Sequence, residues 1–217
     1  AETGGYPQLV KAYEDAAPKY TDRIDALPVL LVVASVYESQ LEDAARAIET
    51  NRQILTIDEN NAIALEAMER LYLKTGRYPD LLGIYQKKLE LEMDPARQKG
   101  IRYQIAQLYE NEIRDPALAV GAYKAILDGV GGENEFLAWQ ALDRIYTATA
   151  QWAELQATIP RELDLVDPAD TAAIVDLKFR LGQIREQHLA DVPGAIDCYR
   201  EILEVMPAHA GAREALE

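Results

Sequence analysis

The sequence predicts an all-α protein, a right-handed α-solenoid of stacked antiparallel helix pairs that forms one domain over residues 1–217. Three observations support this prediction. Similar segments recur along the chain at a nearly constant interval, apolar residues recur at the helical spacing, and no segment alternates between polar and apolar residues over a useful length. Because one helix pair cannot bury its apolar stripe alone, repeated pairs are expected to stack, with a concave and a convex side.

The repeat unit consists of two alternating halves. One shift of the sequence superposes Ala47 on Ala119, and a slightly longer one superposes Ala119 on Ala195. A shift of intermediate length, which we call the repeat shift, places segment 64–78 on segment 138–152. Each half contains two expected helices. The boundaries between halves are expected near residues 24, 60, 95, 133, 168 and 207.

Segment 101–127 represents the first kind of half. Ile101, Ile105, Leu108 and Tyr109 share one helical face, and the second helix carries the stripe Ala119, Val120, Tyr123, Ile126 and Leu127. Between them, Asp115 and Pro116 supply an N-cap and a first-turn proline. The small alanine of each second helix is expected to let two helices approach closely.

Segment 64–85 represents the second kind of half. Leu65, Met68, Leu71 and Tyr72 predict its first helix, and Tyr78, Leu81, Leu82 and Tyr85 predict its second. Gly76 ends the first helix. Asp94-Pro95 and Asp167-Pro168 start the next half, and Asp22 holds the equivalent place near the beginning of the chain. Pro18 and Pro160 are expected to kink or end their helices.

The repeat resembles the tetratricopeptide repeat family, in the alternating double form of bacterial members. The first helix carries a small apolar pair followed by tyrosine, as in Ile105-Ala106 with Tyr109. The second helix carries a small residue followed by an aromatic one, as in Ala119 with Tyr123. This resemblance covers essentially the whole chain and implies a superhelix that binds other proteins.

The sequence departs from the family pattern at several positions. Leu81 and Leu155 replace the small alanine, and Arg185 replaces the usual tyrosine. The segments that begin at Tyr37, Tyr109 and Arg185 carry one extra residue before the small alanine. The side chains of Cys198, Tyr109 and Trp152 are expected to be core or near-core.

Composition excludes several function classes. The chain has 22 basic and 37 acidic residues, a net charge of −15, which argues against a nucleic-acid binder and against an anchor on anionic lipid. Its longest apolar run, Leu27–Val36, is too short to span a bilayer, which takes about 20 residues. Both ends cut through a repeat, so we expect a segment of a longer repeat protein. The apparent lack of a leader favours the cytoplasm.

No residue pattern predicts an enzyme, a metal site or a cofactor. Gly129–Gly132 lacks the ending of a phosphate-binding loop and is interpreted as a helix end and turn. His188 and His209 lack zinc-site spacing, and Cys198 is expected to be buried. Ser35 and Ser39 have no histidine placed as a base. The acidic cluster Glu162, Asp164, Asp167 and Asp170 lacks calcium-loop spacing and is interpreted as a solvated helix end with N-caps.

The family resemblance implies a binding surface along the concave side, which the first helices line. Tyr103 and Gln107 lie about 200° around the helix from Ile105 and Tyr109, so they face away from the expected core. The same construction gives Glu66 and Arg70 in the half before it, and Lys74 lies one turn beyond Arg70. Over all the halves, the candidate groove residues are Leu31, Ser35, Arg70, Lys74, Tyr103, Gln107, Gln140, Arg144, Phe179 and Gln183.

The leading interpretation is a non-enzymatic scaffold whose groove binds a protein or peptide segment. Apolar groove residues would take up side chains, and the arginines would pair with carboxylates or carbonyls. Under the simpler alternative, Tyr103 and Phe179 brace adjacent first helices, and Arg70 and Arg144 pair with neighbouring acids such as Glu66. Two further alternatives remain: a regulatory or substrate-docking segment of a larger enzyme, and a module that forms homo-oligomers through its repeat ends.

Overall fold

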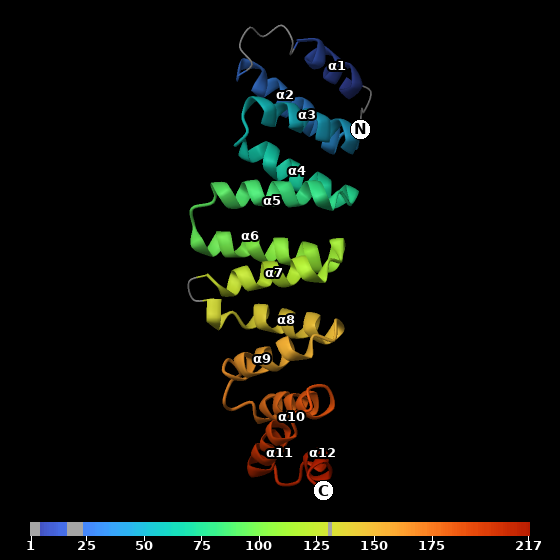
Figure 1. Cartoon of the computed structure of the whole chain (residues 1–217). Coiled ribbons are helices and arrows are strands. Elements are labelled where there is room, and N and C mark those ends of the chain that lie inside the picture. The colour runs from blue at the N-terminus through green and yellow to red at the C-terminus, as the bar shows by residue number, and fades with distance from the viewer. Residues whose placement is uncertain (1–4, 17–23, 130–131) are drawn as a thin grey trace. The chain divides into compact units, whose positions relative to one another are not determined.

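The computed structural model describes residues 5–16, 24–129 and 132–217 (Figure 1). Helices make up most of these residues, and no strand occurs among them. Within each of the two units described below, consecutive helices pack against each other. The prediction of an all-α fold built from repeated helix pairs is therefore confirmed. Pro18 and Asp22, which the sequence interpretation uses, lie outside the described residues.

The chain divides into two compact units, which we describe separately: unit 1, Ala1–Ile113, and unit 2, Arg114–Glu217. The single domain over residues 1–217 stays a prediction. The helices of unit 1 are α1 (Tyr6–Ala16), η3 (Ile24–Ala26), α2 (Leu27–Ser39), α3 (Ala44–Ile57), α4 (Ala62–Thr75), α5 (Tyr78–Leu91), α6 (Pro95–Gln107) and the π-helical turn η4 (Leu108–Ile113). The helices of unit 2 are α7 (Pro116–Leu127), η5 (Gly132–Asn134), α8 (Phe136–Ala148), α9 (Trp152–Leu163), α10 (Thr171–Gln187), α11 (Val192–Val205) and α12 (Ala210–Ala215).

The predicted apolar stripes form the core of each unit. In unit 1, Tyr37, Met68 and Leu81 belong to one buried cluster. In unit 2, Tyr199 and Ile202 are buried between α10, α11 and α12. The alanines expected at close helix approaches, Ala47, Ala119 and Ala195, are all buried. Each stripe gains its stability from removing apolar surface from water, about 25 cal/mol per Å².

The three second helices of the first-kind halves start in the same way. The side chains of Asp43, Asp115 and Asp191 accept hydrogen bonds from the backbone N–H three residues later, at 3.0, 3.0 and 3.1 Å. The residue directly before each cap has a left-handed backbone conformation: Glu42 (φ 51°), Arg114 (φ 59°) and Ala190 (φ 55°). This turn accommodates the extra residue of these halves, and η4 adds a π-helical turn at the end of α6.

Two sequence predictions about unit 2 need comment. Of the two effects expected of Pro160, a kink or a helix end, the end does not occur, because α9 continues through Pro160 to Leu163. The predicted start of α10 was wrong. α10 starts at Thr171 and is capped by Asp170, three residues after the predicted start at Asp167. Residues 167–170 instead form a turn in which the Asp170 N–H donates to the Asp167 carbonyl at 2.8 Å. Because residues 167–170 are held in this turn, α10 begins only after it, at Thr171.

Ala150 holds a strained backbone conformation that glycine would adopt freely. Its φ is 54°, and Gly76, the equivalent residue of unit 1, has φ 66°. Both follow a helix whose end closes with the same hydrogen bond, from Arg77 N–H to the Tyr72 carbonyl or from Gln151 N–H to the Tyr146 carbonyl, each 2.9 Å. We expect Ala150→Gly to raise the free energy of unfolding by about 0.5–1 kcal/mol, measured by urea denaturation.

The reverse substitution in unit 1 provides the matched control. A Cβ at Gly76 would come no closer than 4.0 Å to Tyr78, so Gly76→Ala introduces backbone strain without a steric clash. We expect it to lower the free energy of unfolding by about 1 kcal/mol. If both substitutions changed the free energy of unfolding in the same direction, backbone strain at Ala150 would not be the explanation.

Candidate functional site

The outward face of α4 combines apolar and charged side chains. Ile63, Glu66, Arg70, Leu73 and Lys74, which we call the α4 stripe, are all exposed and fall within about one third of the helix circumference. Ile63 is 62% exposed and Leu73 48% exposed. Two large apolar side chains are therefore exposed on the same charged face of α4.

Arg70 is held by an ion pair within unit 1. Its Nε and Nη2 donate to the two carboxylate oxygens of Glu38 on α2, at 3.0 and 3.1 Å. This hydrogen-bonded pairing raises the pKa of Arg70. The acid that Arg70 contacts is Glu38 and not Glu66, the neighbour on its own helix. The bidentate pair fixes the guanidinium in place along the stripe.

The first helix of the second-kind half in unit 2 repeats this arrangement. Leu137, Gln140 and Arg144 of α8 are exposed, and the repeat shift places them on Ile63, Glu66 and Arg70. Leu137 is 67% exposed. Both units therefore present an apolar residue, a polar residue and an arginine at matching positions on one helix face; we call the second set the α8 stripe.

Ile63 and Leu137 are absent from the candidates derived from sequence. The construction placed two residues per helix, six and two positions before a core tyrosine, and so stopped one turn short of each helix start. The signal for Ile63 and Leu137 was available, because each occupies the second position of its helix and the repeat shift superposes the two.

The candidates on α2 and α6 differ in exposure. Leu31 is half-buried and packs against a small apolar cluster that contains Leu30 and Ile54. Ser35 is exposed, and its carbonyl accepts a hydrogen bond from the Ser39 hydroxyl at 2.7 Å. Tyr103 of α6 is half-buried, whereas Gln107 is exposed.

Phe179 of α10 is part of the packing within unit 2. Its ring centroid lies 5.7 Å from that of Tyr199 on α11 and 5.0 Å from that of His209, the N-cap residue of α12. A Cβ at Gly211 of α12 would lie 2.7 Å from this ring. Phe179 therefore braces two first helices, as the simpler interpretation of the sequence expected.

A pocket in unit 1 borders the α4 stripe. It has a volume of about 310 Å³ and lies between the start of α4, the end of α5 and α6. Leu65, Leu91 and Ile101 form its apolar wall, and Glu66 and Lys88 are among its polar residues. The combination of apolar wall and charged rim suits one apolar side chain of a bound segment.

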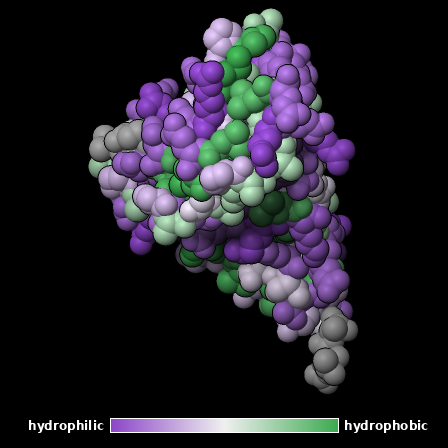
Figure 2. All heavy atoms as spheres, turned by 90° about the horizontal axis from the view of Figure 1, so that it is seen from below, coloured by the Kyte–Doolittle hydropathy of each residue, from purple (hydrophilic) through white to green (hydrophobic). Residues whose placement is uncertain are grey.

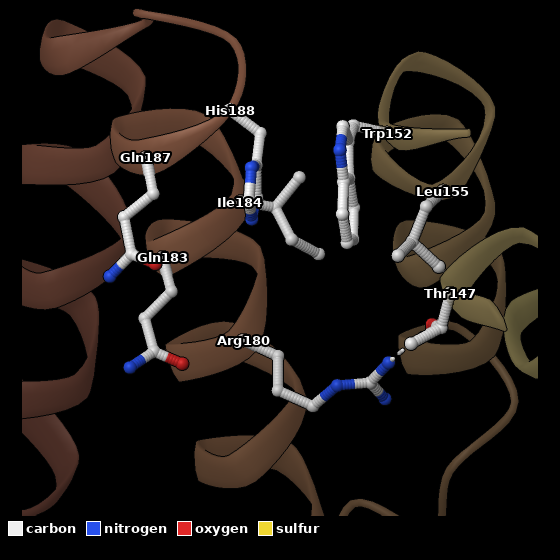
Figure 3. Close-up of a pocket in the computed structure, with 8 residues that line it drawn as sticks. All are labelled: Thr147, Trp152, Leu155, Arg180, Gln183, Ile184, Gln187 and His188. Carbon is white, nitrogen blue, oxygen red and sulfur yellow. Dashed lines mark hydrogen bonds between the residues drawn. The ribbon is translucent and has the colours of Figure 1, made fainter. Parts of the chain in front are cut away.

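A smaller pocket of about 140 Å³ lies in unit 2 (Figure 3). The candidate residue Gln183 lines it together with Thr147, Leu155, Arg180, Ile184 and Gln187. One wall is a stacked pair, Trp152 and His188, whose ring centroids are 3.9 Å apart and whose planes differ by 5°. Figure 3 shows the two rings face to face above Arg180, which reaches across to Thr147. In unit 1, Tyr78 and Glu112 occupy the positions equivalent to Trp152 and His188. These two side chains are also in contact, through a hydrogen bond.

Cys198 was the thiol considered as a nucleophile in the sequence. Cys198 is buried, as expected, and burial raises the pKa of its thiol. The Arg185 side chain donates to its sulfur at 3.3 Å and so fills the place of the family's tyrosine. Within residues 5–16, 24–129 and 132–217, no group of three His, Cys, Asp or Glu side chains could hold a metal ion. Gly129–Gly132 lies partly outside the described residues.

The interpretation of the acidic cluster was wrong for Glu162. This side chain is buried, 4% exposed, although the sequence interpretation placed it in a solvated helix end. Asp164 is exposed at the end of α9, and Asp170 caps α10, as expected.

Figure 2 shows hydrophilic residues over most of the face that it presents, with hydrophobic residues gathered between them. None of the described helices is long and apolar enough to cross a membrane.

Comparisons with known proteins agree with the repeat pattern. A family model described as tetratricopeptide repeat matches residues 64–99, which comprise most of α4, all of α5 and the start of α6. No curated protein sequence matches the chain.

Several solved structures are similar to the chain. YrrB, described as a TPR protein with an unusual peptide-binding site, is 16% identical over 95% of this chain and 98% of its own, with a TM-score of 0.45. The C-terminal part of a TPR repeat-containing protein from Cytophaga hutchinsonii is 12% identical over 98% and 95%, with a TM-score of 0.45. PilF from Pseudomonas aeruginosa is 17% identical over 97% of both chains, with a TM-score of 0.39. Resemblance at this level does not extend to a shared binding site.

Proposed function

We propose that this chain, in which residues 64–99 match a tetratricopeptide repeat model, is a scaffold that binds a segment of another protein along the faces of its first helices. Proteins of this family are generally non-catalytic scaffolds. The observation that carries the proposal is the α4 stripe with its neighbouring pocket, since it places exposed apolar side chains beside an unfilled apolar wall.

The chemistry of the stripe defines the class of partner. One apolar side chain of the partner enters the pocket walled by Leu65, Leu91 and Ile101. An apolar part of the same segment contacts the exposed side chain of Ile63 on the α4 stripe. Lys74, one turn beyond Arg70, attracts a carboxylate or a backbone carbonyl. The partner is therefore a short segment in which an apolar residue stands a few positions from an acidic one, in an extended or helical conformation. Gln140 and Arg144 of the α8 stripe offer unit 2 a second site of the same kind.

Selection from a displayed peptide library tests this function. The full chain is the target, and binding of each selected peptide is measured by isothermal titration calorimetry. We expect Ile63→Asp to weaken binding about tenfold or more, because the substitution buries a charge against the bound apolar residue.

Leu118→Asp serves as the matched control. Leu118 is a similarly exposed apolar residue on α7, outside the first helices, so its substitution leaves binding unchanged. The proposal fails if Ile63→Asp binds the selected peptides as tightly as the wild type does. It also fails if the peptides have no apolar residue in common.

A further inference from the structure

A buried carboxyl pair lies where α8, α9 and α10 of unit 2 meet. Asp143 of α8 is 7% exposed and Glu162 of α9 is 4% exposed, and the charge of Asp143 acts on Glu162. Two ionised carboxylates repel each other and have no proton to donate, so burying both side by side is unfavourable. A proton on one of them removes the repulsion and lets that carboxyl donate to the other.

The other donors around the pair are too few to replace that proton. Arg180 Nη2 of α10 donates to Asp143 Oδ1 at 2.7 Å, and the Thr147 hydroxyl lies 3.4 Å from the same oxygen. Among the described residues, Asp143 Oδ2 and Glu162 Oε1 are buried without a hydrogen-bond donor. A buried acceptor left without a partner costs about 1–3 kcal/mol; a shared proton removes that cost.

The equivalent junction in unit 1 is built with a cation. The repeat shift places Asp143 and Glu162 on Glu69 and Lys88, which form an ion pair. Glu69 also takes part in a hydrogen bond with Tyr85, and burial beside this acid raises the pKa of Tyr85 to about 12. Unit 2 lacks both donors at the equivalent positions. Ile159 replaces Tyr85, and Glu162 replaces Lys88.

We propose that Asp143 and Glu162 share one proton at this junction, and that losing the proton loosens the packing of α9 and α10. With the proton, one negative charge faces one guanidinium. Without it, two buried carboxylates compete for Arg180, and an uncompensated charge remains in the interior. Unit 2 thereby contains a pH-sensitive joint that unit 1 lacks. The inference does not depend on the proposed partner.

The surroundings assign the proton to Glu162. Burial and the neighbouring Asp143 raise the pKa of Glu162 to about 7, against a smaller opposite effect of Arg180. These are the charged groups that act on it from α8 and α10. On α9 itself, Arg161 is directed toward exposed Asp164, 3.9 Å away, and takes no part.

The sign of the pH effect follows from linkage. In the unfolded chain Glu162 is ionised above about pH 4.3, whereas in the folded unit it keeps its proton up to about pH 7. Stability is therefore fully present at low pH and is lost as the pH rises toward 7. We expect the unfolding constant of the wild type, relative to Glu162→Gln, to rise about tenfold per pH unit between about pH 5 and 7 and then to level off.

Urea denaturation of the full chain at pH 5 to 9 measures this difference. Glu162→Gln keeps a donor toward Asp143 at every pH, and Arg161→Gln is the control on the same helix, expected to follow the wild type. Identical pH profiles for the wild type and Glu162→Gln would overturn the proposal.

Two measurements on the wild type test the proposal without relying on the variant. Carboxyl ¹³C shifts are expected to show Glu162 titrating near pH 7; a midpoint near its ordinary value would refute proton sharing. Amide exchange, corrected for its intrinsic pH dependence, is expected to increase in α9 and α10 between pH 6 and 8 but not in α4 and α5. Equal changes in both units would refute the loosening.

Discussion

Replacing Leu81 with alanine is expected to lower the free energy of unfolding by about 3 kcal/mol, because it deletes a fully buried side chain and leaves a cavity. Leu81 belongs to the core cluster of unit 1, with Met68 and Leu71. In the family pattern this position carries a small alanine, so the substitution restores the family residue. The structure predicts damage nonetheless, since neighbouring side chains already pack around the leucine.

Equilibrium urea denaturation, monitored by far-ultraviolet circular dichroism, measures this effect. Leu155, which holds the same position in unit 2 and is also buried, is expected to respond similarly to alanine. Leu118→Ala, at a position 48% exposed on α7, is the control and should cost less than about 0.5 kcal/mol. A stability gain in Leu81→Ala would show that the family pattern outweighs local packing.

Replacing Gly182 with valine is expected to destabilise the chain by about 2–3 kcal/mol through overpacking. A Cβ at Gly182 of α10 would lie 2.6 Å from Cε1 of Tyr199 on α11. That ring cannot turn aside easily, because it is buried and its hydroxyl donates to the Glu186 carboxylate at 2.9 Å. The glycine is required here by close helix approach and not by backbone conformation.

Gly121→Ala is the matched control for this clash. Gly121 lies within α7 of the same unit, and a Cβ there would meet nothing within 4 Å. We expect Gly121→Ala to raise the free energy of unfolding by about 0.5–1 kcal/mol, because alanine favours the helix. Thermal unfolding that gives the two glycine substitutions the same sign would argue against the packing explanation.

Much of the fold could be predicted from the sequence because its signals are local. Asp115 and Asp94 cap helices at the expected places, and Gly76 ends α4 in the left-handed conformation. Each signal needs only hydrogen bonds between residues two to five positions apart. The start of α10 was predicted too early because Asp167 and Asp170 are both good caps, and only the turn between them selects the second.

The candidate site could be predicted only in part. Helical geometry correctly placed Arg70 and Lys74 on an exposed face of α4. It could not identify Glu38 as the partner of Arg70, because the two are 32 residues apart and meet only when α2 and α4 are in place. It also could not tell that Phe179, on the same nominal face of its helix, would pack against Tyr199 and α12.

The sequence by itself determined the positions of most helices, their caps and the alternation of two kinds of helix pair, because periodicity and capping act within a few residues. The tertiary structure alone decided which of the polar residues are buried. Glu162 looks like a surface residue in sequence, yet it is enclosed by Asp143 and Arg180. Such an environment depends on how three helices pack, and each contributes a side chain from a distant part of the chain.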